Sequence, residues 1–243
     1  MSAAAFALVV VILSFGAFVQ AVSGFGFALV GVPLTSIVVT PSRAVVIVAL
    51  ASLLASVRNA LAARHDIEVP VAARMTAAAL VGMPLGLVVL EVVSDQALRL
   101  TIGALVALTA ALIAAGVELR RGTVISDVLT GFVSGVLNTS TGTNGPAVVI
   151  GLRAHRLGVV RFRGTMATVF IVSGVVALAL FAARGRIHAS DVAVAGASLP
   201  AQLFTAFGGD RAGRHLGDHR FDRLVITLLL ASAIAAVATA LAK

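Results

Sequence analysis

The first 42 residues carry no charged side chain, and the stretch Ser23-Gly24-Phe25-Gly26-Phe27 interrupts this apolar run. A related break follows at Thr139-Ser140-Thr141-Gly142-Thr143-Asn144-Gly145-Pro146. Helical backbone that is broken at membrane depth is tolerated only where it is buried in protein or lines a cavity. Paired breaks in two halves of a membrane protein are the strongest sequence pointer to a transport site.

The composition supports a membrane protein. Of the residues, 60% are hydrophobic and only 12% are charged, with a mean hydropathy of +1.10, whereas soluble domains carry roughly 25% charged residues. We therefore expect an all-α, multi-pass integral membrane protein in which residues 1–243 form one transmembrane domain in the lipid bilayer.

The charge pattern excludes several function classes. The net charge is +8, but the basic residues lie in connections between apolar segments, as expected for loops that set orientation. Nucleic-acid binding is not expected, because no basic patch lies on a soluble module. The chain has no cysteine, and its five histidines show no metal-ligand spacing. We expect neither a metal nor a cofactor.

Ten apolar segments follow along the chain, two of them too short to span a membrane, since spanning needs about 20 residues. The segments are 4–21, 26–39, 44–63, 75–93, 98–117, 124–138, 144–154, 164–183, 192–208 and 224–241. Each short segment, 26–39 and 144–154, joins its predecessor as a broken helix or as a re-entrant hairpin. This alternative stays open, and the orientation of the termini depends on it.

The two halves of the chain, 1–121 and 122–243, look related, with about four helical elements in each. Four residues of the first half match four of the second at one constant offset: Gly16, Gly26, Ala28 and Val30 against Gly135, Gly145, Ala147 and Val149. The segment order agrees with this match, so we expect an internal duplication.

The breaks predict an anion site. A half-helix that begins at membrane depth has unsatisfied N–H groups and the positive end of the helix dipole, which together bind anions without a charged side chain. Polar neighbours and one arginine complete the candidate set: Gln20, Ser23, Gly24, Phe25, Gly26, Asn138, Thr139, Ser140, Thr141, Gly142, Thr143, Asn144, Gly145 and Arg163. The alternative is that these small residues only allow close helix packing, and that Arg163 extends to the interface.

Two further patterns constrain the mechanism. The G-x-x-x-G pairs Gly82/Gly86 and Gly131/Gly135 predict close helix packing. None of the ten acidic residues falls in the middle of an apolar segment, so no carboxylate relay for protons is visible. Either the anion carries its own proton, or transport follows the gradient of the anion and the membrane potential.

These motifs resemble the TauE/SafE family of membrane permeases, proposed exporters of sulfite and organosulfonates. The resemblance rests on the first break with the following Val32-Pro33-Leu34, on the block from Gly131 to Pro146, and on Arg161-Phe162-Arg163. It implies a duplicated four-helix unit, small-anion transport and a location in the bacterial inner membrane. The family often has three glycines at each break, so Phe25, Phe27 and Asn144 indicate a different substrate within it.

We therefore expect a transporter, most simply an exporter, of a small oxyanion such as sulfite or a short organosulfonate, bound at facing half-helix N-termini. The alternatives are a small carboxylate carrier and a non-transporting membrane accessory subunit. An enzyme is not expected, because no acid–base constellation stands at membrane depth. Transport direction, coupling ion and homo-oligomerisation stay open.

Overall fold

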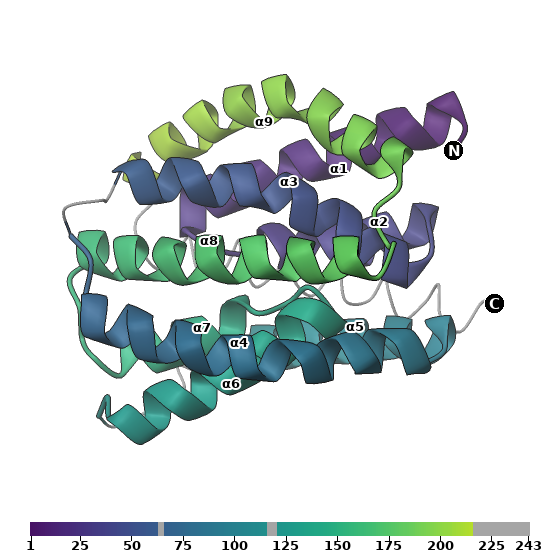
Figure 1. Cartoon of the computed structure of the whole chain (residues 1–243). Coiled ribbons are helices and arrows are strands. Elements are labelled where there is room, and N and C mark those ends of the chain that lie inside the picture. Colours follow the sequence, from purple (N-terminus) through teal and green to yellow (C-terminus); the bar gives the residue numbers. More distant parts are fainter. Residues whose placement is uncertain (63–65, 116–120, 216–243) are drawn as a thin grey trace.

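A computed structural model describes residues 1–62, 66–115 and 121–215, and in these ranges all regular secondary structure is α-helical (Figure 1). The all-α expectation is confirmed for this part of the chain, and the expected helix 224–241 lies outside it. The helices are α1 Ala3–Ser23, α2 Phe27–Val38, α3 Pro41–Ala62, α4 Val69–Val92, α5 Asp95–Ala114, α6 Val124–Ser140, α7 Gly145–Arg153, α8 Val159–Ala183 and α9 Ala189–His215.

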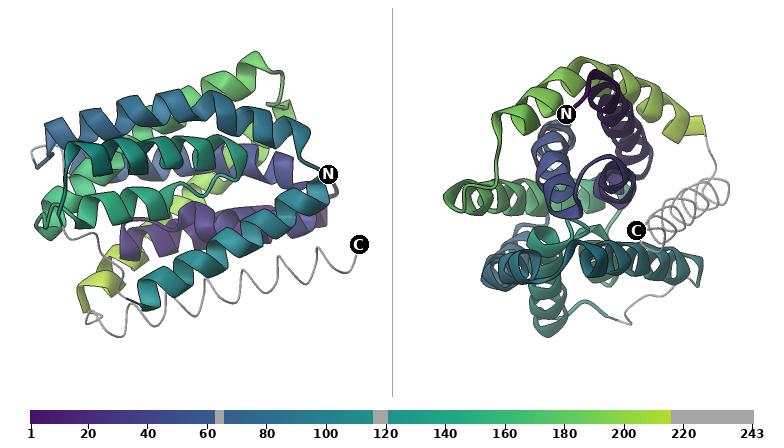
Figure 2. Two further views of the ribbon diagram at one scale, coloured as in Figure 1. Left: turned by 90° about the horizontal axis from the view of Figure 1, so that it is seen from below. Right: turned by 90° about the vertical axis from the view of Figure 1, so that its right-hand side faces the viewer.

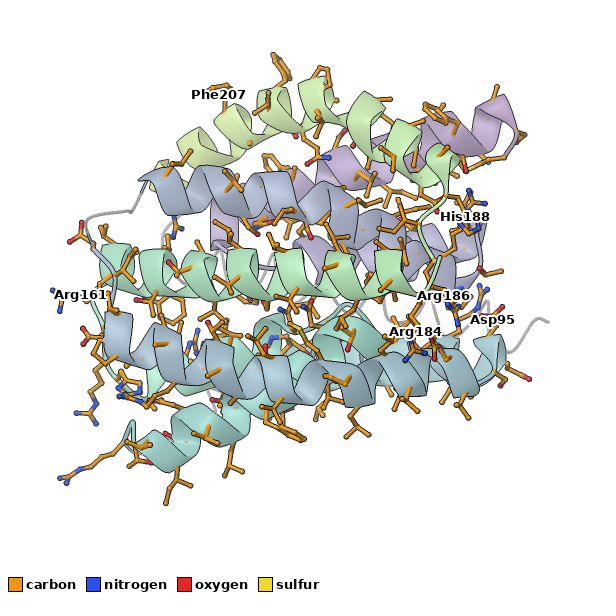
Figure 3. All side chains as sticks on the ribbon, in the orientation of Figure 1. Asp95, Arg161, Arg184, Arg186, His188 and Phe207 are labelled. Carbon is orange, nitrogen blue, oxygen red and sulfur yellow. The ribbon has the colours of Figure 1, made fainter. Side chains whose placement is uncertain are left out.

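The helices form an integral membrane protein. In α1, α4, α5 and α8 the structure has helices long and apolar enough to cross a bilayer. Large apolar side chains face outward, with Val81 at 70% and Phe207 at 71% exposure. Figure 3 shows Arg161 at one end of the bundle and Arg184 and His188 at the other. An apolar belt between two charged ends matches a bilayer. The belt fits the hydrocarbon core, because lipid tails are as apolar as the protein core, and the charged ends fit the two polar surfaces.

The first break is a hairpin. Gly24 and Gly26 both have positive φ values, 84° and 96°, which reverse the chain between α1 and α2. A Cβ atom added to Gly16 of α1 would lie 3.2 Å from the carbonyl oxygen of Phe27, the first residue of α2. Further along, Ser2 and Thr40 line one surface hollow. Helix α2 therefore returns along α1 to the end where α1 begins, so the re-entrant hairpin is the correct alternative here.

The second break is also a hairpin. Gly142 has a φ of 70° and reverses the chain between α6 and α7. Gly151 of α7 packs against Thr130 of α6, and the N–H of Gly122 donates to the carbonyl of Ala154 at 2.9 Å. Helix α7 thus returns to the start of α6. This hairpin opens at the end of the bundle that carries Arg161, whereas the first opens at the end that carries His188 (Figure 3).

Glycines allow α4 and α6 to pack backbone against backbone. A Cβ atom on Gly131 would meet the carbonyl oxygen of Met75, and one on Gly135 would meet that of Ala79. Likewise, a Cβ atom on Gly82 of α4 would meet the carbonyl oxygen of Phe132 in α6, and one on Gly86 would meet that of Val136. The packing interpretation of both G-x-x-x-G pairs is confirmed.

The helix contacts follow a reciprocal pattern. Helix α1 packs on α9 as α6 packs on α4, and α2 meets α3 as α7 meets α8, while α3 and α8 contact each other. The end-on view in Figure 2 shows α1 and α9 on one side and α4 and α6 on the other. Two ion pairs follow the same pattern: Arg43–Asp191 at 2.7 Å and Arg161–Glu68 at 3.3 Å. Two related halves would produce this pattern, and the duplication itself remains a prediction.

We predict that Gly135→Ala destabilises the protein, because the added methyl group collides with the Ala79 carbonyl. Overpacking of this kind costs about 1–3 kcal/mol. Thermal unfolding in detergent measures the effect. The matched control is Gly196→Ala in α9, where no atom lies within 4 Å of the added methyl. Equal melting temperatures for the two variants would contradict the close packing of α4 on α6.

Candidate substrate cavity

Both breaks contribute to one small internal cavity. Its volume is about 50 Å³, and a single water molecule needs roughly 10–15 Å³ by this measure, so the space suits a ligand of a few heavy atoms. Three groups of residues line it: Gln20, Phe25, Gly26, Phe27, Ala28 and Leu29 from the first hairpin, Asn138, Gly142, Asn144 and Gly145 from the second, and Val48, Ala49, Ser52, Leu53, Ser56, Phe170 and Gly174 from α3 and α8.

The cavity lies about halfway along the long helices. Its α3 wall runs from Val48 to Ser56 within a helix of residues 41–62, and its α8 wall consists of Phe170 and Gly174 within a helix of residues 159–183. Seven residues of the predicted site come together here: Gln20, Phe25, Gly26, Asn138, Gly142, Asn144 and Gly145. They come from hairpins that enter the bundle from opposite ends.

Two helix N-termini face this cavity. Helix α2 begins at Phe27 after Gly26, helix α7 begins at Gly145 after Asn144, and neither preceding residue caps its helix through a side-chain hydrogen bond. The first N–H groups of a helix have no partner within that helix. Their positive partial charge therefore points into the cavity from two directions, which favours an anion there.

Buried amides add directional polar groups. Gln20 is 3% exposed, and within the described residues its Oε1 has no hydrogen-bond partner. Asn138 donates from Nδ2 to the carbonyl of Ser173 at 3.2 Å, which fixes the orientation of this amide. Ser52 donates to the carbonyl of Ala49 at 3.2 Å. A buried oxygen without a partner is costly, and Gln20 places such an acceptor beside the cavity.

The hydroxyls of the second break point elsewhere. Thr139 donates to the carbonyl of Met83 at 2.6 Å and so joins α6 to α4. Ser140 donates to the carbonyl of Val136 at 2.6 Å, and the hydroxyls of Thr141 and Thr143 lie 2.8 Å apart. In the described structure these four side chains bond within or next to the hairpin, and they are not among the residues that line the cavity. Their expected contact with a substrate remains a prediction.

Arg163 supports the first break from α8. Its Nη2 donates to the carbonyl of Val22 at 2.9 Å, near the C-terminus of α1, and its side chain packs beside Gly24. A cation at this position is favourable, because the helix dipole is negative at its C-terminus. Neither Arg163 nor Gly24 belongs to the cavity lining, and the expected contact between Arg163 and an anion remains a prediction. The side chain of Ser23 lies outside the described structure.

Sequence reasoning missed the α3 and α8 walls. Ser52 and Ser56 stand four residues apart and therefore share one helix face, which is the one signal that could have indicated them. Phe170 and Gly174 have the same spacing but are indistinguishable from ordinary apolar helix residues. The small side chains on these walls leave room for the cavity between α3 and α8.

A buried ionic cluster holds the open end of the second hairpin. Asp127 of α6 is fully buried and accepts from Arg74 Nη2 at 2.8 Å, while His155 Nε2 lies 2.6 Å from its second oxygen. The cluster joins α4, α6 and the residues after α7. Sequence reasoning placed these residues at segment ends but did not bring them together. Within the described ranges, no group of three His, Asp or Glu residues could hold a metal ion.

Comparison with known proteins identifies the family. The family model described as sulfite exporter TauE/SafE matches residues 8–236, nearly the whole chain. The chain belongs to this family. Membership implies a membrane exporter of sulfite or a related anion, and the matched span includes both breaks and all cavity walls. No curated protein and no solved structure matches the chain.

We predict that Arg163→Gln lowers the melting temperature and weakens anion binding, because the α1 terminus loses its charged donor. A hydrogen bond to a charged group contributes about 1.5–3 kcal/mol. Arg156→Gln is the control, since Arg156 is exposed and lies in the loop after α7. Thermal unfolding and binding isotherms at fixed salt compare the two variants. Equal losses would mean that the bond from Arg163 to Val22 contributes nothing specific and that Arg163 acts only through its charge.

Proposed function

We propose that this protein exports a small oxyanion, sulfite or a short organosulfonate, and that the anion binds between the two hairpin tips. One observation carries the proposal. The N-termini of α2 and α7, which belong to separate hairpins, face one cavity of about 50 Å³. Such an arrangement attracts negative charge from two sides and admits only a small ligand.

The absence of a cation from the cavity lining in the described structure suits transport. A carrier must bind its ligand firmly enough to take it up and weakly enough to release it. Helix dipoles contribute about 0.3–1 kcal/mol each at exposed positions and up to about 2 kcal/mol when partly buried. An arginine in contact with the anion at this depth would hold it far more strongly, because charge interactions strengthen as water is excluded.

The aromatic residues favour the smallest anions. Phe25, Phe27 and Phe170 all line the cavity and restrict its volume. Sulfite has one sulfur and three oxygen atoms, and it places polar oxygens toward both helix N-termini. A short organosulfonate would in addition pack its carbon atoms against these rings. Bulky sulfonates are disfavoured by the size of the space.

Gln20 suits an anion that carries its own proton. Its Oε1 can only accept a hydrogen bond, and an anion without protons has none to give. Hydrogen sulfite has an O–H group that could donate to this oxygen. No acidic or histidine side chain lies among the residues that line the cavity in the described structure. Transport of the protonated anion would therefore need no proton relay in the protein.

The opposed hairpins support alternating access. If the two halves are inverted repeats, then α1 to α4 correspond to α6 to α9, and the cavity lies at their interface. The ion pairs Arg43–Asp191 and Arg161–Glu68 stand at opposite ends of the bundle. Rocking of one half against the other would open the cavity to each side in turn, and each ion pair would stabilise one closed end.

Two other functions remain as rivals. A small carboxylate carrier would use the same dipoles, but a carboxylate has two oxygens where sulfite has three. A non-transporting accessory subunit would have no need of a polar cavity between two helix N-termini. The two helix N-termini and the amide and hydroxyl groups that line the cavity favour oxyanion transport.

Flux in proteoliposomes tests the proposal. The purified protein would be supplied with sulfite, sulfoacetate, taurine and lactate, with and without a pH gradient. We expect saturable sulfite flux that exceeds lactate flux, and a dependence on the gradient if hydrogen sulfite is the transported form. Lactate flux equal to sulfite flux would favour the carboxylate carrier. Liposomes without protein supply the background rate.

We predict that Asn144→Ala weakens anion binding about tenfold or more, because a hydrogen bond to a charged group contributes about 1.5–3 kcal/mol. Asn144 lines the cavity and precedes α7. Gln202→Ala is the matched control, since Gln202 is a buried amide of α9 that bonds to Ser198 outside the cavity. Thr141→Val tests the hydroxyls behind the tip. An unchanged isotherm for Asn144→Ala would remove this residue from the site.

A further inference from the structure

A second cavity opens at the end of the bundle where α1 begins. Its volume is about 720 Å³, and it lies between the start of α1, the turn from α2 to α3 and the first turns of α5. Its polar lining includes Ser2, Thr40, Arg43, Asp95, Gln96 and Arg99. None of these residues belongs to the central cavity between the hairpins. The space is wide enough for a ligand much larger than sulfite.

Arg99 is the unusual residue of this cavity. It is only 6% exposed, and its Nη1 is buried without a hydrogen-bond partner in the described structure. Within the same residues, no carboxylate lies within salt-bridge distance of its guanidinium group. Arginine is almost never buried unless it is paired, because an uncompensated buried charge is strongly destabilising. The guanidinium therefore indicates a negatively charged ligand that compensates it.

The other charged groups of the cavity do not supply this compensation. Arg43 is already neutralised, because its Nε lies 2.7 Å from Asp191 Oδ1 and its Nη2 lies 2.6 Å from Ser190 Oγ. Asp95 stands four residues before Arg99 on α5, but it is exposed, and within the described residues its carboxylate forms no ion pair. Its place in the first turn of α5 is itself favoured by the helix dipole. Among the described residues that line this cavity, Arg99 is thus the buried side-chain cation that lacks a negatively charged partner.

We propose that Arg99 forms a second oxyanion site, at one end of the bundle and separate from the central cavity. A guanidinium group presents paired N–H donors in one plane, which match two oxygens of a sulfonate, sulfite or phosphate group. Thr40 and Gln96 add neutral hydrogen-bonding groups around it.

The position of the site makes two sources of oxyanion available. Asp95, Arg184, Arg186 and His188 gather at this end of the bundle, where the helices end (Figure 3). Charged residues of this kind mark the boundary between membrane and water. An oxyanion there comes either from solution, as an exported or incoming anion, or from the phosphate of a lipid headgroup. The proposal rests on residues outside the central cavity. The Arg99 site can therefore fail its test while the proposed transport function holds, and the transport function can fail while the Arg99 site holds.

Thermal unfolding of lipid-depleted protein in detergent tests the solution source. Sulfate serves as the probe and replaces chloride at constant ionic strength. We expect sulfate to raise the melting temperature of the original protein. Arg99→Gln should lose this response or need at least tenfold more sulfate, and without sulfate it should unfold at no lower temperature, because it lacks the unpaired charge. Arg186→Gln removes an equal charge at the same end and should respond like the original protein.

Two further variants separate the sites and guard against misfolding. Asn144→Ala alters the central cavity and should leave the sulfate response at Arg99 intact. Arg99→Lys keeps the charge but not the paired donors, so it should fold and bind sulfate about tenfold more weakly than arginine, in line with the geometric difference between the two cations.

Lipid retention tests the headgroup source. The protein would be reconstituted with phosphatidylglycerol or phosphatidylcholine, extracted, and weighed intact by native mass spectrometry. Retained lipid that is lost in Arg99→Gln but kept in Arg186→Gln identifies a lipid phosphate as the ligand. A sulfate response that depends on Arg99 identifies a soluble oxyanion. If Arg99→Gln matches the original protein in both experiments, the site does not exist.

Discussion

The structure depends on how a membrane protein accommodates helix ends within its interior. Lipid offers no hydrogen bonds to backbone groups, so an irregular chain segment at membrane depth must be enclosed by protein. The tips at Gly24–Gly26 and Gly142–Asn144 are two such segments. Gly24 lies against Met166 and Arg163 of α8, and Gly142 lies against Val45 of α3. The backbone-to-backbone packing of α4 on α6, made possible by their glycines, holds the second tip in place. Thr139 adds a direct bond from that tip to Met83 of α4.

The same constraint creates the site. A hairpin that ends inside the bundle leaves the N–H groups of its returning helix without partners, and enclosure by protein removes the water that would have bonded them. Placing two such helix starts at one cavity concentrates positive potential there, with no cation among the described residues that line it. The unpartnered oxygen of Gln20 has the same origin, because the residue stands in the last full turn of α1 before the break. The same unpartnered polar groups therefore destabilise the empty fold and are available to bind a ligand.

The positions of the two breaks could be predicted from the sequence. The side chains that each helix turns toward the cavity could not. The short segments 26–39 and 144–154 correspond to α2 at Phe27–Val38 and α7 at Gly145–Arg153, because glycine and proline act locally and leave clear signals. The choice between broken helix and hairpin needed the tertiary contacts of Gly16 and Gly151. Which side chains face the cavity could not be read, since helices surrounded by lipid and by an apolar core show no polar stripe. The hydroxyls of Thr139 and Ser140 bond to backbone carbonyls in the described structure, and their contact with a substrate stays a prediction. Ser52 and Ser56 line the cavity and were not predicted.

The protein has two kinds of positive group at different depths: the guanidinium of Arg99 at one end of the bundle and the helix N-termini at the central cavity. The difference in their strength matters for transport. At the end of the bundle, the proposed site offers a full guanidinium charge at Arg99 beside a wide cavity. Halfway along the helices, where protein encloses the cavity and leaves room for few water molecules, partial charges on backbone N–H groups are sufficient. A full charge at that depth would trap the anion, whereas partial charges let it leave. On this argument the strength of each group is matched to its surroundings, and an arginine moved from the end to the cavity would convert a carrier into a binding protein.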